Sequence, residues 1–209
     1  MIDLIILALI AYFIIKKLKS ILGEESDEMY FGYEAKSKNG NMKDAEQVNI
    51  DNEIQNEEYN TLSADAKLNF QAICSRIQNF SLSKFQDISS KVLERVIKAN
   101  NDKNEKEIRQ FLSKELAGFV INSFKNNEKN NIFLVSILEN KIVDVIKTNE
   151  VFDIKVSFKM EQINYITDEN NSIIEGNKHD IVLVNEMWTF THDFSKKDNT
   201  WFVSQIKEI

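Results

Sequence analysis

Proline is absent from this 209-residue chain, glycine occurs five times and cysteine once. We attribute the lack of proline and glycine, and the many Asn, Lys and Ile residues, to an AT-rich genome, and draw no functional conclusion from it. The single cysteine, Cys74, excludes an internal disulfide and is compatible with a reducing compartment. The two histidines, His179 and His192, are isolated and form no recognisable motif.

Sequence signatures of common catalytic and cofactor sites are also missing. The chain has no glycine-rich phosphate loop, no metal-ligand spacing and no nucleophile elbow. Nucleic-acid binding is not supported, because residues 61–209 are close to neutral and carry no basic stripe interleaved with aromatic residues. We therefore expect no cofactor, no metal and no catalytic residue, and a protein that is not an enzyme.

The chain opens with an almost unbroken apolar run, from Ile2 to Ile15, followed by Lys16, Lys17 and Lys19. A signal peptide carries its positive charge before the run and a small-residue cleavage site after it, and both are missing. A helix extended to residue 22 spans a bilayer if the three lysines reach the headgroups. The segment 1–22 is therefore predicted as an uncleaved transmembrane anchor, with the following chain on the cytoplasmic side and the lysines against anionic lipid. A core or interfacial helix is the alternative.

Residues 23–60 are polar and acidic, with eleven acidic residues and three lysines between positions 24 and 60. Such a stretch buries too little apolar surface to offset the entropy lost on ordering, so it is predicted as a disordered tether. An aromatic cluster at 29–33 within it is either a short docking motif or a local contact. The remainder, residues 61–209, has the length of one domain.

Helical periodicity dominates the first half of that domain. Apolar residues at three- and four-residue steps predict one helix over 66–80 and a second over 85–99. Asp102 and Glu105 have the spacing of a capping box that opens a third helix, and Ser113 is the predicted cap of a fourth.

The period changes to two in the second half, which predicts half-buried strands. Residues 141–148 and 151–166 are predicted as paired strands joined near Asn149, followed by strands over 180–194 and 200–209. Helices followed by antiparallel strands indicate an α+β domain. The alternating apolar positions of the central strand are Phe152, Ile154, Val156, Phe158 and Met160.

The last third of the chain resembles the closing hairpin of the domain named for subunit 44 of the mitochondrial inner-membrane translocase, a Tim-type import adaptor. Matching residues are Glu175-Gly176, Trp188-Thr189-Phe190, Asn199-Thr200-Trp201 and Phe202-Val203. The opening "LALIAYFIIKKLKSILG" is similar to the anchor of alphaproteobacterial members, and residues 80–116 match their helical segment more loosely. The chain departs from the family in its alanine-poor helices and in a hairpin turn without proline.

This resemblance implies a cystatin-like, nuclear-transport-factor-like cone, in which N-terminal helices pack on a curved antiparallel sheet around an apolar pocket. It implies a membrane-anchored adaptor related to protein transport, at the cytoplasmic face of a bacterial inner membrane. The mitochondrial relatives tether a chaperone to a channel or a ribosome to the membrane. We therefore expect a translocon, chaperone or ribosome as the partner, with anionic lipid of the inner membrane as a further contact.

The expected pocket would bind an apolar peptide or a lipid. Its predicted lining is Phe152, Ile154, Val156, Phe158, Glu186, Trp188 and Phe190. Glu186 shares a strand face with aromatic residues, which predicts a raised pKa. The alternative function is a small pocket isomerase or hydrolase that uses Glu186, with His192 or Tyr165 converging on it. A bulge or the strand end would instead turn Glu186 to water, or a cross-strand lysine would pair with it.

Overall fold

The computed structural model of the protein describes residues 57–125, 128–197 and 200–209. The predicted anchor, with Lys16, Lys17 and Lys19, and residues 23–56 of the predicted tether lie outside these residues. None of the described helices has the length and the hydropathy that a membrane span requires.

Five described helices precede the sheet, and serine or asparagine side chains cap four of them. Ser63, Ser81, Asn104 and Ser113 each accept a hydrogen bond from the backbone N–H three residues further on, which satisfies an otherwise unpaired donor of the first turn. The helices are α3 (Glu57–Thr61), α4 (Ala64–Cys74), α5 (Leu82–Asn101), α6 (Glu105–Phe111) and α7 (Lys114–Ser123).

Three details of the predicted helices are wrong. Helix α4 ends at Cys74 rather than near residue 80, and the chain turns through Asn79, which has a positive φ, before α5 begins. Asp102 is the C-cap of α5, and Asn104 caps the next helix in its place. Helix α3 lies within the stretch predicted as tether, because Tyr59 is buried against the core. The predicted cap at Ser113 is confirmed.

The strands form one antiparallel sheet in the order β1-β2-β4-β5, and the short β3 pairs with the far end of β2. Strands β1 and β5 are therefore its edges. The strands are β1 (Lys129–Thr148), β2 (Val151–Thr167), β3 (Ile173–Gly176), β4 (Val182–Asp193) and β5 (Phe202–Glu208).

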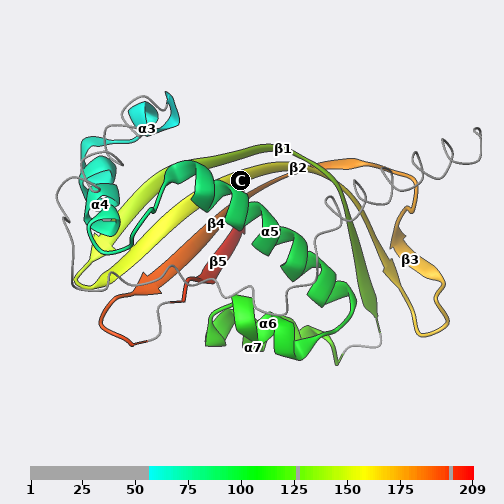
Figure 1. The fold of residues 1–209 in the computed structure, drawn as a ribbon. Coiled ribbons are helices and arrows are strands. Elements are labelled where there is room, and N and C mark those ends of the chain that lie inside the picture. Colours follow the sequence, from blue (N-terminus) through cyan, green and yellow to red (C-terminus); the bar gives the residue numbers. More distant parts are fainter. Residues whose placement is uncertain (1–56, 126–127, 198–199) are drawn as a thin grey trace, which may run out of the picture. The chain divides into compact units, whose positions relative to one another are not determined.

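Strand β1 begins twelve residues before the strand predicted at 141–148. It contains three bulges, and the extra residues Val135, Leu138 and Val143 have no partner on β2. Bulges bend a strand and increase its local twist. Figure 1 shows the resulting β1–β2 hairpin arching over α5.

The helices cover one face of the sheet, and the buried side chains between them form a single apolar core. Its centre is aromatic: the Phe85 ring lies 5.4 Å from Phe190 and 5.2 Å from Trp201, both edge to face. A backbone hydrogen bond of 2.8 Å from the N–H of Ser113 to the carbonyl of Val203 ties α7 to β5. The α+β architecture, with helices packed on an antiparallel sheet, is confirmed.

Candidate functional site

The predicted pocket residues lie on the helix-facing side of β2 and β4, where six of the seven are core side chains. Phe152, Ile154, Val156, Phe158, Trp188 and Phe190 are each at most 2% exposed. Phe158 and Trp188 contact edge to face with their ring centroids 5.8 Å apart. These side chains are part of the buried core between the sheet and the helices. That they bind a ligand therefore stays a prediction.

Glu186, the seventh residue, is half-buried on the same side of β4. Its carboxylate accepts a 2.8 Å hydrogen bond from the indole Nε1–H of Trp188, and its neighbours across the sheet are Phe158 and Glu208. Burial raises the pKa of Glu186, the indole hydrogen bond opposes that rise, and the charge of Glu208 adds to it. The predicted direction of the shift is confirmed. Within the described chain no lysine forms an ion pair with Glu186.

The residues expected to join Glu186 in catalysis lie elsewhere. His192 pairs with Phe152, six residues along β4 from Glu186, and its ring stacks on Phe194 at 4.1 Å. Tyr165 pairs with β3 and stacks on Phe133 at 5.9 Å. The expected convergence of His192 or Tyr165 on Glu186 is therefore wrong. No group of three or more acidic, His or Cys residues in the described segments could hold a metal ion.

A groove of about 680 Å³ lies between the C-terminal half of α5 and the first half of β1. Its volume is within the range of small-molecule and peptide sites. Ile97 of α5 faces the groove together with the apolar residues of β1 between Ile132 and Ile137, of which Phe133 and Val135 are 49% and 46% exposed. Polar residues also line the groove: Glu94, Lys98, Asn101, Asp102, Lys129, Asn131 and Ser136.

Beside the groove, Asn101 binds the edge of the sheet through its side chain. Its Nδ2 donates to the carbonyl of Ile132 at 2.5 Å, and its Oδ1 accepts from the N–H of Ile132 at 3.0 Å. The amide thus takes the place of a neighbouring strand at that residue. In the sequence, Asn101 lies just beyond the helix predicted over 85–99, and nothing there distinguishes it from other polar residues at a helix end.

Three further helix side chains bind β1 beyond the groove. Gln86 donates to the carbonyl of Asn140 at 2.8 Å, and Asn140 returns a bond of the same length to the carbonyl of Gln86. Glu58 accepts from the N–H of Ile142 at 2.7 Å, and Asn69 donates to the carbonyl of Val145 at 2.9 Å. These bonds protect an edge that would otherwise present unpaired backbone groups.

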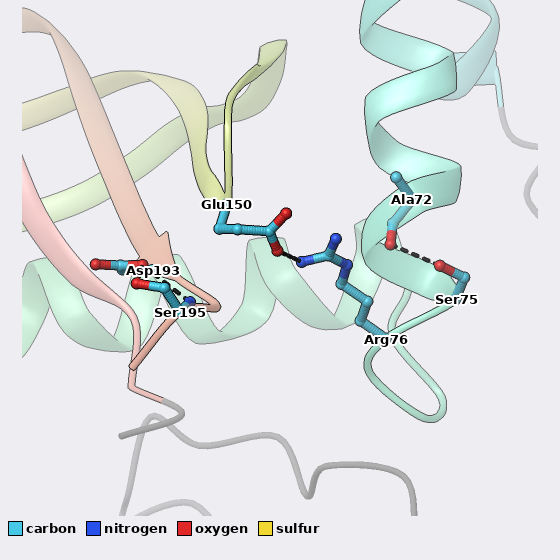
Figure 2. Close-up of polar contacts among 6 residues, drawn as sticks. All are labelled: Ala72, Ser75, Arg76, Glu150, Asp193 and Ser195. Carbon is cyan, nitrogen blue, oxygen red and sulfur yellow. Dashed lines mark hydrogen bonds and ion pairs between the residues drawn. The ribbon is translucent and has the colours of Figure 1, made fainter. Parts of the chain in front are cut away.

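A separate polar cluster lies at the β1–β2 turn. Figure 2 shows Arg76, after α4, pointing to Glu150 in that turn. The guanidinium Nη1 of Arg76 lies 2.5 Å from Oε2 of Glu150. The hydrogen bond and charge of Arg76 lower the pKa of Glu150, and two bonds from Ser195 lower the pKa of Asp193. The Arg76 guanidinium also lies 4.9 Å from the centroid of the Phe194 ring. These contacts fix the turn to the loop after α4.

The family described as Tim44-like domain matches residues 66–208. No curated protein matches.

Similar solved structures include the intermembrane space region of the chloroplast protein ARC6, which is 10% identical with a TM-score of 0.38, over 59% of this chain and 95% of that one. Another is a nuclear transport factor 2-like superfamily protein from Salmonella enterica serovar Typhimurium LT2. It is 7% identical with a TM-score of 0.38, over 62% of this chain and 92% of that one.

Proposed function

This chain belongs to the Tim44-like domain family, since the match covers residues 66–208, and from that membership we propose that it is a membrane-anchored adaptor for protein translocation. Membership of this family supports a membrane-associated adaptor role for the domain. Our proposal places the domain at the cytoplasmic face of a bacterial inner membrane, held by the segment 1–22. Lys16, Lys17 and Lys19 would contact anionic headgroups there, as charges flanking a membrane span do.

The groove between α5 and β1 supports a binding role for the domain. It combines apolar residues, among them Ile97, Leu134 and Ile137, with polar groups, which is the usual composition of a ligand site. We assign to it an apolar segment, supplied by a polypeptide of the translocation machinery or by an acyl chain. A translocon, a chaperone or a ribosome would supply the polypeptide partner. The predicted pocket residues on β2, from Phe152 to Phe158, pair with β1 beyond the groove and do not line it.

Photo-crosslinking from the groove tests this assignment. A photoreactive phenylalanine analogue replaces Ile97 in one variant and, as a control, Phe119 of α7, which is 77% exposed. In membranes, Ile97 is expected to give adducts with protein or lipid that the Phe119 control does not give. Equal adducts from both positions, or none from Ile97, would contradict the groove as the binding site.

Catalysis through Glu186 is the competing function. Only the raised pKa of Glu186 favours it, and the groups that would assist a general acid or base lie elsewhere on the sheet. Glu186→Gln separates the two functions. An adaptor keeps its adducts and its growth phenotype, whereas an enzyme dependent on the carboxylate loses its turnover.

A further inference from the structure

The wall of the groove that α5 provides carries a charged side chain at each turn of the helix. Glu94, Lys98 and Asp102 line the groove at four-residue steps, with Ile97 and Asn101 between them. Residues at this spacing lie on one face of a helix and follow one another at about 6 Å along its axis. The charge along this face therefore changes from negative to positive to negative over about 12 Å.

These three charges are available to a ligand. All three residues are exposed, and none of them forms an ion pair with another residue of the described segments. Across the groove lie the apolar side chains of β1, among them Phe133 and Leu134. An acyl chain would fit the apolar wall but has no charge to set against the other wall. A polypeptide can supply both kinds of group.

The edge of β1 beside the groove favours a helix over a strand as the ligand. A strand adds to a sheet edge through a continuous ladder of backbone hydrogen bonds. The bulges at Val135 and Leu138 interrupt the ladder here, and the side chain of Asn101 already binds the backbone of Ile132. A helix needs no such ladder, because its own backbone groups bond to one another.

We propose that the groove binds an amphipathic α-helix of a partner polypeptide, which presents positive, negative and positive charges to Glu94, Lys98 and Asp102. This inference rests on the proposed function and names the class of ligand for the same groove. The helix would bury its apolar face against Ile97 and Leu134, the usual mode of binding for a helix in a hydrophobic groove. The charge pattern on α5 reads the same in both directions. It therefore selects the face and the register of the partner helix, but not its direction.

Binding of two synthetic peptides to the full-length protein tests the proposal. Both peptides are amphipathic helices of about twenty residues, with the same composition and the same stripe of leucines. Beside the stripe, the matched peptide carries Lys, Glu and Lys at four-residue steps, and the inverted peptide carries Glu, Lys and Glu. We expect the matched peptide to bind at least about tenfold more tightly at low salt, because three exposed ion pairs replace three like-charge contacts. Salt should reduce this preference.

Exchange of the charges on α5 provides the matched variants. The triple variant Glu94→Lys, Lys98→Glu, Asp102→Lys is expected to prefer the inverted peptide by a similar factor. The control Asp87→Lys, Lys91→Glu changes exposed charges of α5 that do not line the groove, and should keep the wild-type preference. Equal binding of the two peptides to the wild-type protein, binding of neither, or an unchanged preference in the triple variant overturns the proposal.

Photo-crosslinking from Ile97 separates a failure of this proposal from a failure of the groove as a binding site. The photoreactive Ile97 variant is irradiated with the matched peptide and vesicles of phosphatidylethanolamine and phosphatidylglycerol. Adducts with the peptide are expected. Adducts with lipid alone overturn the helix as the ligand but leave the groove as a binding site, and adducts within the chain or between two copies also overturn it. No adduct of any kind contradicts the proposed function as well.

Discussion

Replacing Asn101 should weaken the attachment of α5 to the edge of the sheet. The side chain makes two hydrogen bonds to Ile132, and a typical bond contributes about 0.5–1.5 kcal/mol to stability. Two such bonds together contribute about 1–3 kcal/mol. Because water can reach the freed groups of Ile132 through the groove, we expect Asn101→Ala to lower the free energy of unfolding by about 1–2 kcal/mol, the lower half of that range. Asn101→Asp keeps the size of the side chain but sets a charged acceptor against the Ile132 carbonyl, and should cost more.

Thermal unfolding and hydrogen exchange together measure this effect. A loss of 1–2 kcal/mol corresponds to a fall in Tm of roughly 2–8 °C for a domain of this size. The Ile132 amide should exchange faster in both variants, while Asn100→Ala on the same helix should behave as wild type. Wild-type stability for Asn101→Asp, within about 0.5 kcal/mol, would refute the assignment of Asn101 as a substitute for a neighbouring strand.

Three further predictions follow from single contacts. Gly176→Ala should detach β3, because φ is +76° and an added Cβ would lie 2.4 Å from the Asn164 carbonyl oxygen; unchanged exchange in β3 would contradict this. Glu186 has a raised pKa in the folded state, so its stabilising effect is present at low pH and lost as pH rises through that pKa. Glu186→Gln should therefore be more stable than wild type at pH 7 and equal to it below about pH 4, and urea unfolding that shows no gain at pH 7 would contradict it. Arg76→Gln should raise the pKa of Glu150 toward its ordinary value, and an unchanged NMR titration of that carboxyl would count against their ion pair.

The helices were largely predictable because their apolar residues keep the helical period and their caps are serines or asparagines. The predicted helix boundaries are wrong where two sequence signals for a helix end or start lie close together. Asp102 with Glu105 has the spacing of a capping box, yet Asn104 caps α6 because Asp102 still belongs to the last turn of α5. Ile77 and Phe80 have helical spacing but are buried from a loop.

The first half of β1 escaped prediction because its bulges destroy the period of two. The residues of β1 that pair with the even-numbered residues of β2 are 132, 134, 137, 140, 142 and 145, so they follow one another at steps of two or three. That spacing resembles neither a regular strand nor a helix. Strand β2 has no extra residues opposite β1; its burial alternates from Val151 to Gln162, and it was predicted almost to its ends.

The groove was not predicted for the same reason, since one of its walls is the unrecognised half of β1. Its other wall contains Asn101, which resembles any polar residue at a helix end until Ile132 is placed beside it. Pocket lining was predicted from the alternation of β2 and β4 instead. That alternation identifies the core-facing side of a sheet, but it does not show whether helices fill the space above it.

The contact of Phe80 and Phe85 with Trp201, just before the last strand, has a consequence for biosynthesis. Phe80 and Phe85 complete their aromatic contacts only with Trp201, which is more than one hundred residues further along the chain. At about 5–20 residues per second, the ribosome needs on the order of ten seconds to make the intervening segment. Strands β1 and β2 are made before Trp201, but the aromatic contacts of Phe80 and Phe85 stay incomplete until Trp201 follows. The core of the domain can therefore close only after the last residues of the chain have been made.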